Sequence, residues 1–211
     1  MIKYIVVIPA RYKSKRLPGK PLKIIDGIPM IVRTYNQCLK VVPFNKIFVA
    51  TESLKIKNVC DKYSIQTILT SDTCLTGTDR VAEVSKKINS DLYINVQGDE
   101  PFFNPLDLKK LINQAVKNPK EIINGYAEIK DEKFYNSSSI PKVIFDKKGY
   151  LLYMSRGQIP SNKDKKFVKG WRQICAYSFP KKSLEIFSKN KKKTTIENIE
   201  DIEILRFLEL G

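Results

Sequence analysis

The apolar run at residues 3–10, KYIVVIPA, constrains the fold more than any other part of this chain. Its residues are largely β-branched and show almost no polar alternation, which is typical of a strand buried on both faces in a parallel sheet. Parallel neighbours need crossover connections, usually helices, between them. Further strands are predicted at 46–50, 66–69 and 92–96, and helices between and after them at 29–40, 52–62, 78–88 and 105–117. This alternation predicts an α/β fold with an open, mostly parallel sheet.

Two helix starts can also be predicted. Pro29 suits the first helical position, since its missing N–H would have no partner there. Thr78 suits the N-cap of the helix at 78–88, because its hydroxyl can accept a hydrogen bond from the first turn.

The pattern changes after residue 120, where strands and turns replace the strand–helix alternation. Helices return at 181–189 and 195–209. We therefore expect an α/β domain formed by residues 1–120 and 181–211, with an inserted β-rich arm at 121–180. The strands expected in the arm are 122–129, 142–145, 150–155 and 173–179, with a turn at 146–149.

The composition is that of a globular protein. Of the 211 residues, 42% are hydrophobic and 28% are charged, which provides enough apolar surface for a core and excludes a disordered chain. No apolar run reaches the ~18 residues that a membrane span needs, so we expect no membrane insertion. The N-terminal apolar run precedes the cations and has no small-residue cleavage site, so we expect no signal peptide and a cytoplasmic location.

The charge balance is strongly basic, with a formal net charge of +16. Such a surface favours polyanions, so a nucleic-acid binder stays open as an alternative. However, 31 of the 38 basic residues are Lys and only 7 are Arg, the residue that typically reads base edges. A solvated surface is the simpler interpretation, and we expect no nucleic-acid partner.

The chain contains no His. Its four cysteines are not arranged in CxxC pairs, so Cys/His zinc sites and His-dependent triads are excluded. A general base would have to be Asp, Glu, Lys, Tyr or a metal-bound hydroxide. Buried free thiols are the simplest interpretation of Cys38, Cys60, Cys74 and Cys175.

A basic loop follows the first strand, at residues 9–20 (PARYKSKRLPGK). Five cations lie within ten residues, and Gly19 allows the backbone to approach an anion closely. Cationic side chains together with exposed amides suit a triphosphate. The spacing is neither a Walker A motif nor a dinucleotide fingerprint. A solvated charged loop is the alternative interpretation.

A second motif follows a strand, and a third opens a helix. In VQGDEP, residues 96–101, Asp99 suits Mg²⁺ bridged to phosphate oxygens, although a capped turn with solvated carboxylates is the alternative. In TGTDR, residues 76–80, amides and hydroxyls could contact a base or sugar, although an ordinary helix N-cap is the alternative. In open α/β sheets, ligands bind outside the carboxyl ends of the strands, where the basic loop and the VQGDEP motif are expected.

These motifs, in this order and spacing, resemble the CMP-sugar synthetases, and most of all the 3-deoxy-manno-octulosonate (Kdo) cytidylyltransferase family. The resemblance continues through residues 141–160 (PKVIFDKKGYLLYMSRGQIP) and 197–208 (ENIEDIEILRFL), and so covers nearly the whole chain. It implies a nucleotidyltransferase fold, Mg²⁺ as cofactor and a homodimer. It also implies transfer of CMP from CTP to Kdo with release of pyrophosphate, for lipopolysaccharide or capsule synthesis.

The resemblance assigns roles to single residues. Catalytic roles, with Asp99 also as the metal ligand, fall on Arg11, Arg16, Lys20 and Asp99. Nucleotide contacts fall on Ala10, Arg11, Ser14, Arg16, Lys20, Thr78, Asp79, Arg80 and Gln97. Contacts to the sugar acid fall on Gln97, Lys142, Arg156, Gln173, Tyr177 and Glu203.

The implied chemistry needs no His. The anomeric hydroxyl of the sugar acid attacks the α-phosphorus, while metal and cationic side chains neutralise charge and align the reactants. The guanidinium fork of Arg156 suits a carboxylate. A surface arginine, a core aromatic and a solvated helix face remain the alternatives for Arg156, Tyr177 and Glu203.

Several positions depart from the family pattern. Gln173 replaces a common His, Ile204 replaces a Gln, Lys163 replaces an Arg, and residues 177–179 replace a Tyr-Gly-Tyr stretch. These positions are on the sugar side of the resemblance. A related sugar acid, such as 8-amino-Kdo or a nonulosonic acid, therefore stays open, as does a catalytically weak nucleotide-binding protein.

Two expectations concern assembly and the end of the chain. The arm has many apolar strand residues and few helices to cover them, which predicts a two-fold dimer through the arm. The family continues for tens of residues and supplies a second metal-binding Asp. We expect the form that ends at Gly211 to bind CTP but to turn over slowly or not at all. We expect a longer natural chain to carry an Asp within a few tens of residues past Gly211.

Overall fold

The computed structural model describes residues 2–13 and 17–211, which form two compact units. The first unit comprises the chain up to Ile123 together with Cys175–Lys191. The second comprises Asn124–Ile174 and Lys192–Gly211. The two units are described separately.

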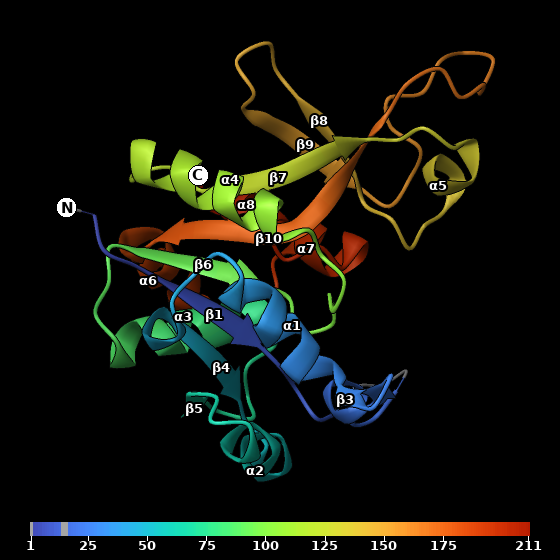
Figure 1. The fold of residues 1–211 in the computed structure, drawn as a ribbon. Coiled ribbons are helices and arrows are strands. Elements are labelled where there is room, and N and C mark those ends of the chain that lie inside the picture. Colours follow the sequence, from blue (N-terminus) through green and yellow to red (C-terminus); the bar gives the residue numbers. More distant parts are fainter. Residues whose placement is uncertain (1, 14–16) are drawn as a thin grey trace. The chain divides into compact units, whose positions relative to one another are not determined.

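The first unit is built on a sheet with the strand order β5-β4-β1-β6-β10 (Figure 1). The first four of these strands are parallel, and the second half of β10 runs antiparallel to β6. The strand bounds are β1 Tyr4–Pro9, β4 Ile47–Thr51, β5 Thr67–Leu69, β6 Leu92–Val96 and β10 Trp171–Pro180. The open, mostly parallel sheet predicted from the sequence is confirmed.

Helices cover both faces of this sheet, with α1 and α4 on one side and α3 and α6 on the other (Figure 1). Val6 and Ile8 lie in the core beneath α1 and α4, while Val7, between them in sequence, faces the opposite side. The α-helix bounds are α1 Met30–Leu39, α2 Leu54–Lys62, α3 Gly77–Lys87, α4 Pro105–Lys117 and α6 Lys181–Lys189. The short elements are η1 Lys20–Leu22, η2 Phe44–Lys46, and the hairpin of β2 Ile24–Ile25 and β3 Ile28–Pro29.

Both predicted helix starts are displaced. Pro29 is the N-cap of α1, since its ψ of 141° is extended and it still pairs with Ile24 in the β2–β3 hairpin. The N-cap of α3 is Thr76, whose side chain accepts from the N–H of Asp79. Thr78 lies inside the first turn of that helix and is fully buried.

The second unit has strands in the order β10-β8-β9, with β7 also paired to β10. The first half of β10 belongs to this unit and its second half to the first unit. The element bounds are β7 Ile123–Glu128, α5 Glu132–Asn136, β8 Lys142–Phe145, β9 Leu151–Ser155, α7 Thr195–Glu200 and α8 Leu205–Leu210. The β-rich character predicted for the arm is confirmed.

Residues 192–211 pack with the second unit, and not with the α/β domain to which the sequence analysis assigned them. The predicted single helix at 195–209 was also wrong. Asp201 adopts a left-handed conformation with φ of 50°, which ends α7 before α8 begins. The carboxylate of Glu200, at the end of α7, accepts hydrogen bonds from the end of β9, which ties this segment to the arm.

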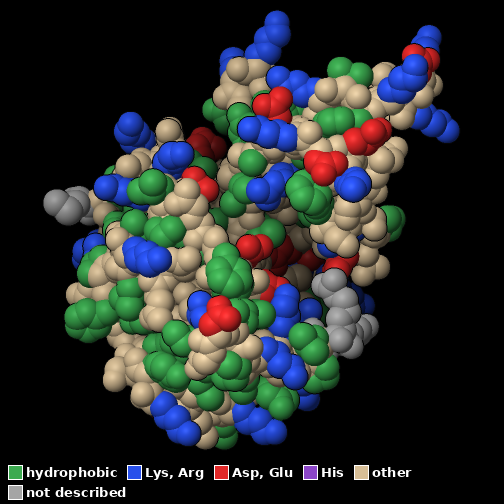
Figure 2. Space-filling model, turned by 45° about the vertical axis from the view of Figure 1, so that its right-hand side comes forward, with side chains coloured by type: hydrophobic (Ala, Val, Ile, Leu, Met, Phe, Trp, Pro, Cys, Tyr) green, Lys and Arg blue, Asp and Glu red, His purple; other side chains and the backbone are tan. Residues whose placement is uncertain are grey.

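Two surface properties bear on function. Within the described residues, every helix is too short or too polar to cross a bilayer. On the face shown in Figure 2, Lys and Arg side chains are interspersed with acidic and hydrophobic ones. This mixture favours a solvated basic surface over the continuous stripe that is typical of nucleic-acid binders.

Candidate active site

The three sequence motifs meet at one edge of the first unit's sheet. β1 and β6 are adjacent and parallel, so the loops that follow Pro9 and Val96 leave from the same edge. The start of α3, at Gly77, packs against both strand ends. The crevice position expected for a ligand in an open α/β sheet is therefore occupied by these loops.

Two glycines allow this close approach. A Cβ atom on Gly98 would lie 2.8 Å from the carbonyl oxygen of Pro9. A Cβ atom on Gly77 would lie 3.3 Å from the side-chain amide of Gln97 and 3.3 Å from the ring of Pro9. The Thr34 hydroxyl of α1 donates to the Gly98 carbonyl at 3.2 Å, which holds the second loop from the other side.

Gly98→Ala tests this packing. Because the new methyl group would meet backbone and not a flexible side chain, we expect the variant to lose about 1–3 kcal/mol of unfolding free energy. Its CTP affinity should also fall, since the loop that carries Asp99 must shift. Urea denaturation and calorimetry measure the two effects. An unchanged midpoint together with unchanged CTP affinity would contradict the close packing described here.

Lys20 and Asp99 form the charged centre of the edge. The Lys20 Nζ lies 2.5 Å from the Asp99 Oδ2, and the two side chains are 36% and 47% exposed. Gly19, with φ of 67°, closes the basic loop through its N–H, which donates to the Tyr12 carbonyl at 2.8 Å. A cation of the basic loop therefore lies beside the carboxylate that was predicted to bind a metal.

The other residues predicted in the basic loop have different surroundings. Arg11 is exposed, whereas Ala10 is 5% exposed and its N–H donates to the Ala50 carbonyl. Ser14 and Arg16 lie outside the described residues. Nucleotide contacts by these four residues stay predictions.

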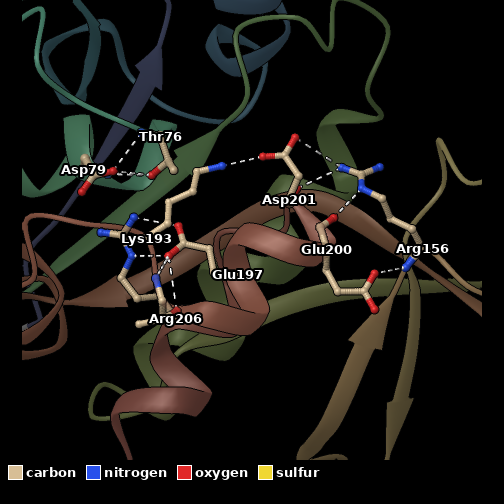
Figure 3. Close-up of polar contacts among 9 residues, drawn as sticks. Thr76, Asp79, Arg156, Lys193, Glu197, Glu200, Asp201 and Arg206 are labelled. Carbon is tan, nitrogen blue, oxygen red and sulfur yellow. Dashed lines mark hydrogen bonds and ion pairs between the residues drawn. The ribbon is translucent and has the colours of Figure 1, made fainter.

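The loop that opens α3 is a helix-capping structure. The Asp79 carboxylate accepts hydrogen bonds from the Thr76 N–H at 2.8 Å and from the Thr76 hydroxyl at 2.7 Å (Figure 3). In return, the Asp79 N–H donates to the Thr76 hydroxyl. The N-cap alternative for this segment is thus what the structure shows. Nucleotide contacts by Thr78 and Asp79 stay predictions.

Arg80 is turned into the protein, with only 3% of its surface exposed. Its guanidinium pairs with Glu52 at 3.0 Å and also donates to the Thr70 hydroxyl and the Ser71 carbonyl. These partners suit a buried cation, which requires a carboxylate and acceptors around it. A nucleotide contact by Arg80 stays a prediction. Glu52, which the motif analysis passed over, follows directly after β4 at the same sheet edge.

The donor set at this edge fits magnesium bound jointly with substrate. Mg²⁺ in phosphate-transfer sites is usually held by one or two carboxylates together with substrate phosphates. Asp99 supplies one such carboxylate beside the cationic loop. Within the described ranges, no group of three or more Cys, Asp and Glu side chains forms a site that could hold a metal without substrate.

The second unit contains most of the residues predicted for the sugar acid. The Lys142 side chain is fully buried, and its ammonium donates to the carbonyls of Ser137 and Arg156 at 2.9 and 2.7 Å. Burial lowers the pKa of Lys142, and the neighbouring Arg156 guanidinium lowers it further. Gln173 is 6% exposed, and its amide donates to the Met154 sulfur.

Arg156 caps the end of α7 (Figure 3). Its guanidinium donates to the backbone carbonyls of Glu200 at 2.5 Å, Asp201 at 2.9 Å and Ser138 at 3.0 Å. These are carbonyls that a helix end and a loop leave without backbone partners. The guanidinium of Arg156 thus has partners within the protein, and its contact to the carboxylate of a sugar acid stays a prediction.

Glu200 organises the same corner. Its carboxylate accepts from the Ser155 hydroxyl at 2.7 Å and from the backbone N–H of Arg156 at 2.8 Å. Burial alone would raise the pKa of Glu200, but these bonds and one from the Tyr153 hydroxyl outweigh burial and lower it. Glu200 was not among the residues predicted for the site.

Tyr177 and Glu203 were also predicted to contact the sugar acid. Tyr177 belongs to the first unit, is 3% exposed, and stacks on Phe179 with ring centroids 5.7 Å apart. This is the core aromatic that the sequence left open. Glu203 lies between α7 and α8 and is half-buried. The helix predicted at 195–209 breaks before Glu203, so this residue lies outside both α7 and α8.

Fold and site together define a nucleotide-binding α/β protein with a cationic loop and a carboxylate at the ends of its parallel strands. A family model described as cytidylyltransferase matches residues 5–211. The chain therefore belongs to the cytidylyltransferase family, a family of nucleotidyltransferase enzymes, as the motifs predicted.

Within this family, the chain is similar to enzymes named for 3-deoxy-manno-octulosonate and its 8-amino derivative. The chain is 34% identical to the 8-amino-3,8-dideoxy-manno-octulosonate cytidylyltransferase of Shewanella pealeana, over 98% of this chain and 86% of the relative. It is 36% identical to the 3-deoxy-manno-octulosonate cytidylyltransferase of Francisella philomiragia, over 100% of this chain and 88% of the relative. The solved structure of CMP:2-keto-3-deoxy-manno-octonic acid synthetase complexed with CTP matches with a TM-score of 0.90 and 32% identity, over 99% of this chain and 86% of that one.

Proposed function

We propose that this chain transfers CMP from CTP to a 3-deoxy-2-ulosonic acid, with Kdo as the preferred acceptor, and releases pyrophosphate. The observation that carries the proposal is the pairing of Lys20 with Asp99 at the strand ends where the three family motifs meet. Relatives with 34% and 36% identity are named for this transfer to 8-amino-Kdo and Kdo. The product would serve lipopolysaccharide or capsule synthesis.

The residues at the edge account for the chemistry in physical terms. Arg11 and Lys20 would hold the triphosphate and neutralise its charge, which aligns the α-phosphorus with the attacking anomeric hydroxyl. Asp99 would hold Mg²⁺, which supplies further positive charge to the phosphates when it is bound. The protein forms no covalent bond to the substrates in this scheme, so the lack of His is no obstacle.

The acceptor is less constrained than the nucleotide. Gln173 stands where a His is common in the family, and its buried amide faces the Met154 sulfur. The similar identities to a Kdo enzyme and an 8-amino-Kdo enzyme make 8-amino-Kdo the second candidate acceptor. A nonulosonic acid is the third.

A pyrophosphate-release assay tests the proposed function. The 211-residue chain at micromolar concentration is incubated with CTP and Mg²⁺ and with Kdo, 8-amino-Kdo or a nonulosonic acid, so that even slow turnover is measured. We expect release with CTP and Kdo, and far less when ATP, GTP or UTP replaces CTP. Release with another nucleotide in preference to CTP would overturn the proposal. CTP binding without release from any sugar acid would replace it with the alternative of a catalytically weak nucleotide-binding protein.

Lys20→Ala should weaken CTP binding by about 1–3 kcal/mol, the usual contribution of a charge-assisted contact. The loss of Lys20 also leaves the Asp99 carboxylate facing the triphosphate without its cation. Lys23→Ala is the matched control, because Lys23 is an exposed cation three residues further along. Calorimetry with CTP measures both variants. Arg16→Ala should act in the same direction as Lys20→Ala. Equal affinities for Lys20→Ala and the parent protein would exclude Lys20 from the phosphate site.

We also propose that the protein is a homodimer, joined through its arm, and acts in the cytoplasm, where CTP is available. The second unit exposes large apolar side chains that a partner copy could cover. They are Tyr126, Phe134, Tyr150, Leu152 and Val168, each more than half exposed. Sedimentation at micromolar concentration should give a dimer mass, and a monomer mass would refute the dimer.

A further inference from the structure

We propose that Glu52 is a positioning residue for the nucleotide site, because its one carboxylate holds both the basic loop and the start of α3. This inference rests on the proposed function. Glu52 follows β4, whose carboxyl end lies beside that of β1. It lies outside the three motifs and would not touch the substrates itself.

The two carboxylate oxygens have different partners. Oε1 accepts a hydrogen bond from the Tyr12 backbone N–H at 2.8 Å. Oε2 lies 3.0 Å from a terminal guanidinium nitrogen of Arg80. One side chain thus joins the basic loop to the first turn of α3, two segments separated by more than sixty residues of sequence.

Burial makes this link rigid. The side chains of Glu52 and Arg80 are only 10% and 4% exposed, so water screens their attraction weakly. Arg80 has further acceptors in the Thr70 hydroxyl and the Ser71 carbonyl, which fix its own orientation. A carboxylate held in this way determines where the Tyr12 amide can lie.

The position of the Tyr12 amide matters because Arg11 and Lys13 flank it. A hydrogen bond to that amide restrains the backbone from which both cations project. The free loop therefore loses less conformational freedom when it binds a triphosphate. Arg80 also neutralises Glu52, so that the buried carboxylate does not repel the phosphates.

Glu52→Gln separates positioning from general stability. The amide oxygen can still accept from Tyr12, but the charge that pairs with Arg80 is lost. We expect the KM for CTP to rise at least tenfold and CTP affinity by calorimetry to fall by a similar factor. The KM for the sugar acid and kcat at saturating CTP should change less than threefold. A merely structural role would instead lower the active fraction, and so kcat, without changing the KM for CTP.

Asp61→Asn is the matched control, because Asp61 is a half-exposed carboxylate that pairs with Lys57 on α2. It should leave all three kinetic parameters unchanged. Glu52→Asp keeps the charge with a shorter reach, so it should recover part of the CTP affinity that Glu52→Gln loses. If Glu52→Gln does not fold, amide exchange in the parent protein tests the link: the Tyr12 amide should be protected at least tenfold.

The possible results separate a failure of the positioning role of Glu52 from a failure of the proposed function. If the parent protein fails to bind CTP, both fall. If the parent binds CTP and Glu52→Gln binds it equally well, the positioning role is wrong while the proposed function stands. An unprotected Tyr12 amide in the parent protein would also overturn the positioning role.

Discussion

Asp99→Asn is expected to lower Mg²⁺-dependent turnover by at least about 10²–10³-fold, the range found when one preorganised electrostatic contact to a transition state is removed. The amide has nearly the shape of the carboxylate but cannot supply the negative charge that a hard cation requires. Steady-state pyrophosphate release in excess Mg²⁺ measures the effect. Turnover at the parent rate would show that Asp99 is not the metal ligand.

The melting temperature and the CTP affinity of Asp99→Asn serve as controls. Asp99 is 47% exposed and pairs with Lys20 at the surface, so the melting temperature should change little. Removal of the carboxylate frees Lys20 for the triphosphate, so CTP affinity without Mg²⁺ should stay the same or increase. Asp107→Asn, at an exposed carboxylate on α4, should retain full activity. A variant that lost CTP affinity in the absence of Mg²⁺ would show that Asp99 supports nucleotide binding in a way that does not involve the metal.

The sequence predicted best those helices and strands whose hydrophobic pattern and end signals lie within the element or directly beside it. β6 at Leu92–Val96 and α4 at Pro105–Lys117 have the predicted bounds. β6 is apolar on both faces, and α4 begins with Asn104 as N-cap and Pro105 at its first position. In both elements, residues that are close together in the sequence determine where the element begins and ends.

The elements that were missed depend on contacts distant in sequence. Whether 195–209 forms one helix or two depends on the left-handed Asp201 and on the Arg156 guanidinium that caps the preceding carbonyls. Arg156 is some forty residues away, and periodicity cannot reveal it. For the same reason the sequence could not reveal the backbone carbonyls that surround the Arg156 guanidinium.

The nucleotide edge was easier to predict than the sugar side. The motif positions follow from parallel strands, whose carboxyl ends must meet at one edge, and Lys20 and Asp99 do meet there. Glu52 was missed because a single carboxylate after a strand has no pattern of its own. Its importance comes from Tyr12 and Arg80, which only the fold brings to it.

The largest effect on stability is expected from Arg206→Met in the second unit. Arg206 and Glu197 form a two-bond ion pair at 2.6 and 2.7 Å, and both side chains are fully buried (Figure 3). The same Glu197 carboxylate accepts the Thr194 N–H in the capping box of α7. Removal of the guanidinium would leave this carboxylate buried without its cation, at a cost of about 3–5 kcal/mol.

The only Trp of the chain makes this measurement specific to the second unit. Trp171 lies in the first half of β10, with its ring centroid 5.1 Å from that of Phe145, so its fluorescence reports on this unit. Urea denaturation followed at Trp171 should show the loss for Arg206→Met. Lys193→Ala, which removes a more exposed pair with Asp201, should cost at most about 1 kcal/mol.

A double variant shows whether the stability loss of Arg206→Met comes from the broken ion pair or from the changed packing of the site. Glu197→Gln combined with Arg206→Met replaces both charges, so neither is left buried alone. Because the single variant carries the cost of an uncompensated charge, the double variant should be more stable than Arg206→Met. If the stability losses of the two single variants simply added in the double variant, the two side chains would not be coupled. The stability would then come from packing of the Arg206 side chain and not from the ion pair.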